Sequence, residues 1–172
     1  MNYKLILIAV SLFASIIPVE ADDVIDIKKP IAVPISVSDF QGEVESVLKF
    51  DLSVLGMEIT TPDKAAYQVN GTQNGRLEGK LTSTGANQPM WARAYNGGTP
   101  RTQAHAFAND IVKEIRGTVP IFQGRIAFRL QEGSSTEIAD SDFDGYDTKV
   151  LTHDGTLVTG ASWVPGKREL LY

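Results

Sequence analysis

The sequence contains no cysteine and only two histidines, His105 and His153, among its 172 residues. Without cysteine the chain can form no disulfide, no thiolate zinc site and no cysteine nucleophile. Two histidines alone also exclude a histidine-rich metal centre. The chain has no cluster of basic residues either, and 16 Lys plus Arg against 21 Asp plus Glu give a formal charge of −5. Nucleic acid and anionic lipid are therefore not the expected partners.

Long apolar runs are equally scarce, since the only one extends from Leu5 to Ile17. It follows a short segment with one lysine and is followed by Pro18 and by Val19-Glu20-Ala21, which has small residues at its first and last positions. This pattern predicts a secretory signal peptide at residues 1–21, cleaved after Ala21. An uncleaved N-terminal anchor is the alternative, although the run is short for a spanning helix. After cleavage we expect an exported chain with no integral membrane segment.

Residues 22–29 form a polar and charged stub in which Val24, Ile25 and Ile27 alternate with acidic residues. We predict that this stub is a flexible N-terminal segment, short enough to pair with the edge of a sheet.

Residues 30–120 show the pattern of a small α/β domain. Apolar residues at three- and four-residue spacings predict a helix from Glu43 to Leu55, and Thr99-Pro100 and Gly117 mark the start and end of a second helix. Strands are predicted at 31–37, 57–60, 67–70, 76–82 and 90–95, with turns at Asn70-Gly71, Asn74-Gly75 and Asn96-Gly97-Gly98. The expected fold is α/β (α+β), with two helices on one mixed sheet.

Residues 121–172 show strand patterns alone, at 125–130, 136–140, 148–152 and 170–172. The character of Ile126-Ala127-Phe128 recurs 44 residues later in Leu170-Leu171-Tyr172. That offset lies within the ~40–45-residue period of β-propeller blades. We therefore predict a first propeller blade and the start of a second, an incomplete all-β unit.

The strongest metal-like motif is Asp140-Ser141-Asp142-Phe143-Asp144-Gly145, which has the spacing that opens an EF-hand calcium loop. The twelfth position, however, is Leu151 where a bidentate Glu is expected. Asp144-Gly145 between two predicted strands is also a turn signal in its own right. We favour the hairpin turn and predict no metal and no cofactor, with Asp140, Asp142 and Asp144 as the first ligands if calcium binds.

No motif supports catalysis. The sequence lacks phosphate-binding glycine loops, and Gly160-Ala161-Ser162-Trp163-Val164 lacks the second Gly of a nucleophile elbow. His105 lies beside the apolar face of its helix, where a packed and hydrogen-bonded histidine is usual. Trp91, Tyr95 and Trp163 are candidate partner contacts, but core packing is favoured. We predict that the protein is not an enzyme.

Several segments, in order, resemble the TolB family, periplasmic propeller proteins of the Tol-Pal envelope system. The segments are Pro30-Ile31-Ala32-Val33-Pro34, Ala104-His105-Ala106-Phe107-Ala108-Asn109-Asp110, Arg125-Ile126-Ala127-Phe128, Asp142-Phe143-Asp144-Gly145, Val150-Leu151-Thr152 and Trp163-Val164-Pro165 through Leu170-Leu171-Tyr172. The family's Trp-Ser-Pro-Asp-Gly turn differs here, because Gly166 follows Pro165 directly. The resemblance covers the mature chain but includes only the beginning of the family's propeller.

The resemblance implies a non-enzymatic periplasmic protein that acts by protein–protein interaction in outer-membrane integrity, cell division and colicin import. It implies TolA as a partner of the N-terminal segment, with Asp22, Asp23, Val24, Ile25, Asp26 and Ile27 as contacts. Pal binding is in doubt because the propeller is incomplete. The alternatives are the N-terminal fragment of an exported hydrolase of the prolyl oligopeptidase type, and a degenerate TolB-like copy. A shortened chain and a piece of a longer one both remain open.

Overall fold

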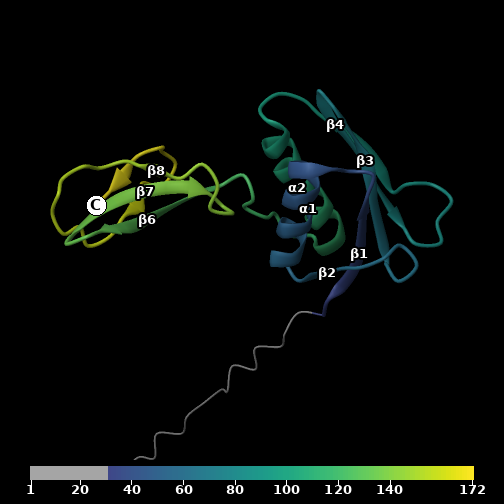
Figure 1. Cartoon of the computed structure of the whole chain (residues 1–172). Helices are drawn as coiled ribbons and strands as arrows, with labels where there is room; N and C mark the ends of the chain where they lie inside the picture. The colour runs from purple at the N-terminus through teal and green to yellow at the C-terminus, as the bar shows by residue number, and fades with distance from the viewer. Residues whose placement is uncertain (1–30) are drawn as a thin grey trace, which may run out of the picture.

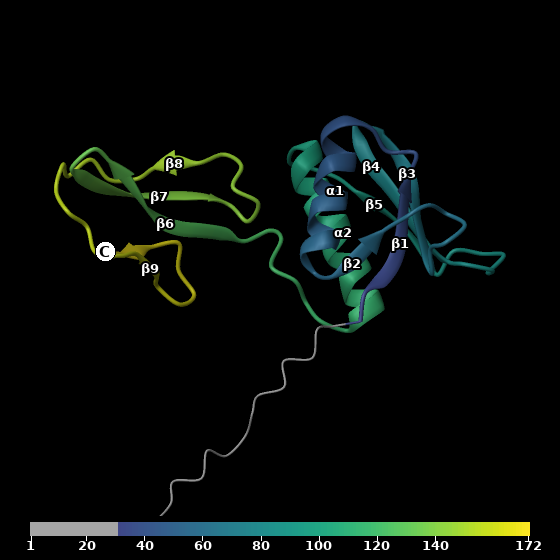
Figure 2. The ribbon, with the colours of Figure 1, turned by 60° about the horizontal axis from the view of Figure 1, so that its bottom comes forward.

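The computed structural model describes residues 31–172, so the predicted signal peptide and the segment 22–29 lie outside the described residues. The described chain forms two regions, which we call the α/β region (residues 31–117) and the β region (residues 125–172) (Figure 1). The two helices lie between the sheet of the α/β region and the strands of the β region in both Figure 1 and Figure 2. The helices therefore face the β region, and the sheet faces away from it.

The α/β region is built on one five-stranded mixed sheet. Its strands are β1 (Val33–Ser38), β2 (Met57–Ile59), β3 (Tyr67–Asn74), β4 (Arg76–Ser83) and β5 (Trp91–Tyr95), in the order β2-β1-β3-β4-β5. Strand β1 is parallel to β2 and β3, and the remaining pairs are antiparallel. Helices α1 (Gly42–Val54) and α2 (Pro100–Arg116) cover one face. The predicted pair of helices on a mixed sheet is confirmed.

Helix α2 follows its sequence signals closely. The Thr99 side chain accepts a hydrogen bond from the Thr102 amide at 3.2 Å, and Pro100 occupies the first turn, where its missing N–H is not needed. Gly117 ends the helix in the left-handed conformation (φ 69°) and its amide bonds the Lys113 carbonyl at 2.9 Å. Within the described residues, no helix combines the length and the apolar character needed to cross a membrane.

Phe107 lies at the centre of the α/β core and is fully buried. Its ring packs against Phe40, Trp91 and Tyr95 with centroid distances of 5.6–5.9 Å. On the sheet below it lies Gly79, where an added Cβ would come within 3.0 Å of the Phe107 ring. A large side chain on the helix is thus matched by the smallest residue on the strand. This match allows α2 to approach the sheet closely.

The predicted turn at Asn70-Gly71 is wrong, because both residues lie inside β3. Gly71 pairs with Gly79 across the β3–β4 ladder, and a Cβ at Gly71 would meet the Phe40 ring and the Glu78 carbonyl. The glycine is required by packing and not by turn geometry. The true hairpin turn is at Asn74-Gly75, as predicted, with Gly75 at φ 77°.

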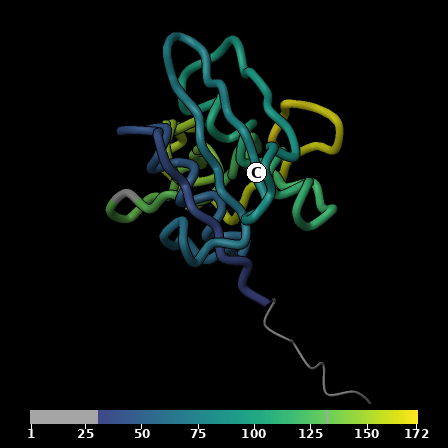
Figure 3. The backbone as a smooth tube through the Cα atoms, turned by 90° about the vertical axis from the view of Figure 1, so that its right-hand side faces the viewer, coloured from purple at the N-terminus to yellow at the C-terminus, as the bar shows by residue number. Residues whose placement is uncertain are grey.

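The β region consists of two small antiparallel sheets. Strands β6 (Arg125–Glu132), β7 (Ser135–Asp142) and β8 (Lys149–Val150) form one, and β9 (Ser162–Trp163) and β10 (Leu170–Leu171) form the other. Seen from the sheet side of the α/β region, they lie behind it (Figure 3). The strands β8 and β10 are shorter than predicted, and β9 was not predicted. The incomplete propeller and the division at residue 120 stay predictions.

Candidate functional site

The acidic segment 140–146 forms the end of β7 and the tight turn that follows it. The Asp142 amide bonds the Tyr146 carbonyl at 2.8 Å, and the Gly145 amide bonds the Asp142 carbonyl at 2.9 Å. Asp144 accepts a further hydrogen bond from the Tyr146 amide at 3.1 Å, and Gly145 has φ 85°. The sequence therefore folds here as the Asp-Gly turn that its composition predicts.

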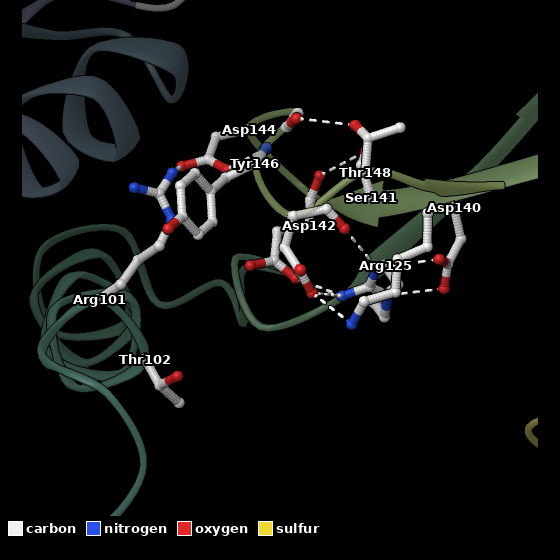
Figure 4. A network of polar contacts seen from close by, with 12 residues as sticks. Arg101, Thr102, Arg125, Asp140, Ser141, Asp142, Asp144, Tyr146 and Thr148 are labelled. Carbon is white, nitrogen blue, oxygen red and sulfur yellow. Dashed lines mark hydrogen bonds and ion pairs between the residues drawn. The ribbon is translucent and has the colours of Figure 1, made fainter.

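Arg125, at the start of β6, binds the first part of this segment (Figure 4). Its Nε and Nη2 donate to the two carboxylate oxygens of Asp140 at 2.6 and 2.9 Å, and Nη1 donates to Asp142 at 2.8 Å. The hydrogen bond from Arg125 lowers the pKa of Asp140, and its charge acts in the same direction. The bidentate Arg125–Asp140 pair thus links β6 to β7 at the open end of the hairpin, where Arg125 lies opposite Asp142 in the ladder.

Arg101, in the first turn of α2, binds the second part. Its guanidinium pairs with Asp144, whose side chain is only 5% exposed, and lies 4.2 Å from the centre of the Tyr146 ring. Figure 4 shows Arg101 and Tyr146 directed toward each other from the helix and the turn. Nearby, Phe143 packs against Phe122 with a centroid distance of 5.4 Å. The turn therefore joins the β region to the helices of the α/β region.

Behind this contact lies a buried acid–histidine pair. His105 Nδ1 is 2.7 Å from Asp51 Oδ2, and its Nε2 is 3.7 Å from Asp144 Oδ2. Asp51 is fully buried in α1. Burial raises the pKa of Asp51, while the hydrogen bond and the charge of His105, together with the charge of Arg101, act against this rise. The prediction of a packed and hydrogen-bonded His105 is confirmed.

Asp51 was not predicted as a site residue, although the sequence contains a signal for it. The apolar face of α1 includes Val44, Val47, Leu48 and Leu52, and position 51 falls on that same face. A lone carboxylate within an apolar stripe must find a partner, because an unpaired buried charge is costly. The partner is on α2, 54 residues away. Arg101 was missed because its partner Asp144 belongs to the other region.

In this arrangement His105 lies between two carboxylates, those of Asp51 and Asp144. An Asp–His pair acts as a general base when the second ring nitrogen reaches a nucleophile. Here His105 Nε2 has no hydrogen-bond partner among the described residues and faces a carboxylate. The pair therefore connects structural elements.

The proposed calcium ligands are bound by arginines. Asp140 and Asp142 face Arg125, and Asp144 faces Arg101 on the opposite side of the turn. In residues 31–172 no group of three or more His, Asp or Glu side chains is arranged to hold a metal ion. The expectation of no metal stays a prediction, and the arginine contacts do not favour its alternative, calcium at Asp140, Asp142 and Asp144.

The remaining predicted site residues are placed as follows. Trp91 and Tyr95 pack against Phe107, and the Tyr95 hydroxyl bonds Asp110 at 2.7 Å, so core packing is confirmed for both. Trp163 lies in β9, beside a hollow of about 360 Å³ between the two small sheets. The predicted partner contacts from Asp22 to Ile27 lie outside the described residues.

Comparison with known proteins finds the same similarity in sequence and in fold. The chain is 29% identical over 109 residues to the Tol-Pal system protein TolB of Geobacter sulfurreducens. This alignment covers 62% of this chain and 25% of the relative. It is 25% identical over 172 residues to TolB of Bordetella avium, covering 81% of this chain and 39% of the relative. No family model matches the sequence.

A crystal structure of TolB from Acinetobacter baumannii has a similar fold, with a TM-score of 0.72 and 17% identity. The similarity covers 81% of this chain and 43% of that one. The chain thus spans between a quarter and about two-fifths of the length of these relatives.

Proposed function

The chain is related to the TolB family of Tol-Pal system proteins, and on this premise we propose that it is a periplasmic protein that acts by binding other proteins of a Tol-Pal system. The observation that carries the proposal is the extent of the fold similarity. It covers 81% of the chain, which is more than the α/β region contains, so the β region contributes to it. Export by the signal peptide at residues 1–21 is part of the proposal.

Within such a system we propose roles in outer-membrane integrity, cell division and colicin import, without enzymatic activity. The relatives named TolB, together with the position of His105 Nε2 facing the Asp144 carboxylate at 3.7 Å, support the non-enzymatic part. The formal charge of −5 supports contact with proteins over contact with nucleic acid.

For the partner contact we propose the segment from Asp22 to Ile27, with the C-terminal domain of TolA as its target. Val24, Ile25 and Ile27 provide apolar side chains between acidic ones. Such a segment can bind by adding a strand to an exposed sheet edge, where main-chain hydrogen bonds give affinity and alternate side chains give specificity. Pal binding, which the resemblance assigns to the propeller, is not part of this proposal.

The experiment is isothermal titration calorimetry of residues 22–172 against the TolA C-terminal domain. The chain should bind, and a chain beginning at residue 30 should not. Ile25→Asp together with Ile27→Asp should weaken binding by about tenfold or more, since these residues project from the same face of an extended strand and apolar anchors contribute more than ~1 kcal/mol each.

Lys28→Gln is the matched control, because residue 28 projects from the opposite face of that strand and lies outside the proposed contacts. It should change the affinity by less than the double variant does. Equal binding by the chains that begin at 22 and at 30 would locate the contact elsewhere. An absence of binding by the longer chain would contradict the proposal and favour a degenerate copy.

A further inference from the structure

Four ionisable side chains from three elements meet where the two regions join. They are Asp51 of α1, Arg101 and His105 of α2, and Asp144 of the turn between β7 and β8, and we call them the junction cluster. Their side chains are between 0% and 14% exposed. Charges buried to this degree must compensate one another, because each has lost most of its hydration.

The two carboxylates, Asp51 and Asp144, carry two negative charges, and Arg101 neutralises only one of them. The net charge of the junction cluster is therefore zero only when the cluster holds one further proton. Arg101 compensates Asp144, with which it forms an ion pair. Asp51 is compensated only when it shares a proton with His105, 2.7 Å away. Loss of that proton leaves a net negative charge next to Asp144, in a site that water reaches poorly.

The imidazole provides a second connection across the junction, beside the Arg101–Asp144 ion pair. One ring nitrogen faces Asp51 of the α/β region and the other faces Asp144 of the turn, at 2.7 and 3.7 Å. A protonated imidazole carries a donor on both nitrogens, whereas a neutral one carries a single donor. Only the protonated ring can therefore attract both carboxylates at once.

We propose that His105 links the two regions in a proton-dependent manner. With the proton, the ring holds the turn at Asp144 against the helices. Without the proton, the excess negative charge repels Asp144 and the β region separates from α2. This inference concerns the chain's own two regions and does not depend on whether the chain binds TolA.

The other groups near the ring make it the element that responds to pH. From α1, Asp51 bonds the ring, and Glu43 reaches Arg101 at 3.4 Å with a side chain that is 44% exposed. From α2, Arg101 keeps its charge at any relevant pH. From the turn, Asp144 faces the ring and Tyr146 covers Arg101. The proton between His105 and Asp51 is therefore the charge of this set that can change while the Arg101 charge stays constant.

The test uses residues 22–172 and measures two quantities separately: the protonation of the His105 ring and the distance between the two regions. Long-range ¹H–¹⁵N spectra of the imidazoles report the protonation of both histidines, with the exposed His153 as an internal reference. Because the chain contains no cysteine, Ser53→Cys and Gln131→Cys place two spin labels, one on each region, at exposed positions. Pulsed electron–electron resonance then gives the distribution of distances between the regions.

The distribution should be narrow while His105 is protonated, and the separated population should rise by about tenfold or more as the ring loses its proton, the effect of one charge-assisted contact. Both changes should share a midpoint. His105→Gln, which cannot change charge, should remove the pH dependence. Asp144→Asn should broaden the distribution at every pH.

Glu43→Gln is the matched control, since Glu43 also contacts Arg101 but is largely open to solvent. It should leave the pH response unchanged. Circular dichroism confirms that each variant keeps its helices. The proposal is overturned if the His105 ring does not titrate between pH 5 and 9, if it titrates without a change in distance, or if the response persists in His105→Gln.

Discussion

The α/β region and the β region are stabilised in different ways. Of the twenty buried hydrophobic residues in the described chain, sixteen lie between Ile35 and Val112. In the β region the buried hydrophobic residues are only Ile138, Ala139 and Val158, whereas five buried residues there are polar: Thr136, Glu137, Asp140, Ser141 and Thr152. The first region has an apolar core, and the second has a network of hydrogen bonds and ion pairs.

Glu137 illustrates how the β region is held. Its carboxylate accepts hydrogen bonds from the Thr152 hydroxyl at 2.6 Å and from the amides of Asp154 and Gly155 at 3.0 and 2.8 Å. The hydrogen bond from Thr152, followed by that from Gly155, lowers the pKa of Glu137. A carboxylate thus fixes the loop after β8 through three hydrogen bonds. Contacts of this kind are directional and depend on pH and salt, unlike apolar burial.

The largest effect is expected from the centre of the apolar core. Phe107→Ala removes a fully buried ring and leaves a cavity against Phe40, Trp91 and Tyr95. We expect a loss of about 3–5 kcal/mol in the free energy of unfolding, measured by denaturant titration of α-helical circular dichroism. Val119→Ala, at a residue that is 76% exposed, should change it by less than about 0.5 kcal/mol. Similar losses in both variants would mean that the α/β region does not depend on its core.

The next largest effect is expected in the β region, from its ion pairs. Arg125→Gln removes the bidentate partner of Asp140, and we expect β6 and β7 to lose about 1–2 kcal/mol of local stability by hydrogen exchange. Arg125 lowers the pKa of Asp140, so the wild-type pair stabilises the fold above the ordinary Asp pKa, about 3.9, and this stability is lost as the pH falls. The variant should therefore show a weaker acid dependence in β6 and β7.

Lys149→Gln is the control for that variant. Lys149 pairs with Asp147 at 2.8 Å, but its side chain is 60% exposed, so its loss should cost no more than about 0.5 kcal/mol. If the two variants have equal effects, the buried position of Asp140 does not matter and the proposed difference between the regions weakens.

The smallest effect is expected from one polar contact within the α/β region. Thr99→Ala removes the side-chain cap of α2 and should cost about 1 kcal/mol, with faster exchange confined to the first turn of the helix. Thr118→Ala, at an exposed position beyond the helix, should have no measurable effect. Loss of protection throughout α2 in Thr99→Ala would show that polar contacts, and not the core, hold this region as well.

The sequence predicts the helices of the α/β region well because the residues that begin and end them are close together in the chain. Thr99, Pro100 and Gly117 define α2 through hydrogen bonds between near neighbours. Gly71 was misplaced because the requirement for glycine comes from Phe40 and from the neighbouring strand, which are distant in sequence. A rule that predicts turns from neighbouring residues therefore cannot detect why this position requires glycine.

The junction could be predicted only in part. His105 was expected to be packed, and the turn at Asp144-Gly145 was expected, but nothing local indicates that they meet. Asp51, Arg101 and Asp144 come together through the packing of three elements whose sequence separations exceed 40 residues. A charged residue on the apolar face of a helix predicts that a buried partner exists, but it does not predict which residue that partner is.

The most direct test of the difference between the two regions is site-resolved hydrogen exchange of residues 22–172 in 0.05 and 1 M sodium chloride. Salt at 1 M reduces the screening length to about 3 Å and weakens ion pairs, while apolar burial is not weakened by it. We expect amides of β6 and β7 to exchange about fivefold faster in high salt, and amides near Leu48 and Ile111 to be unchanged or slower. Equal acceleration in both regions would contradict the account.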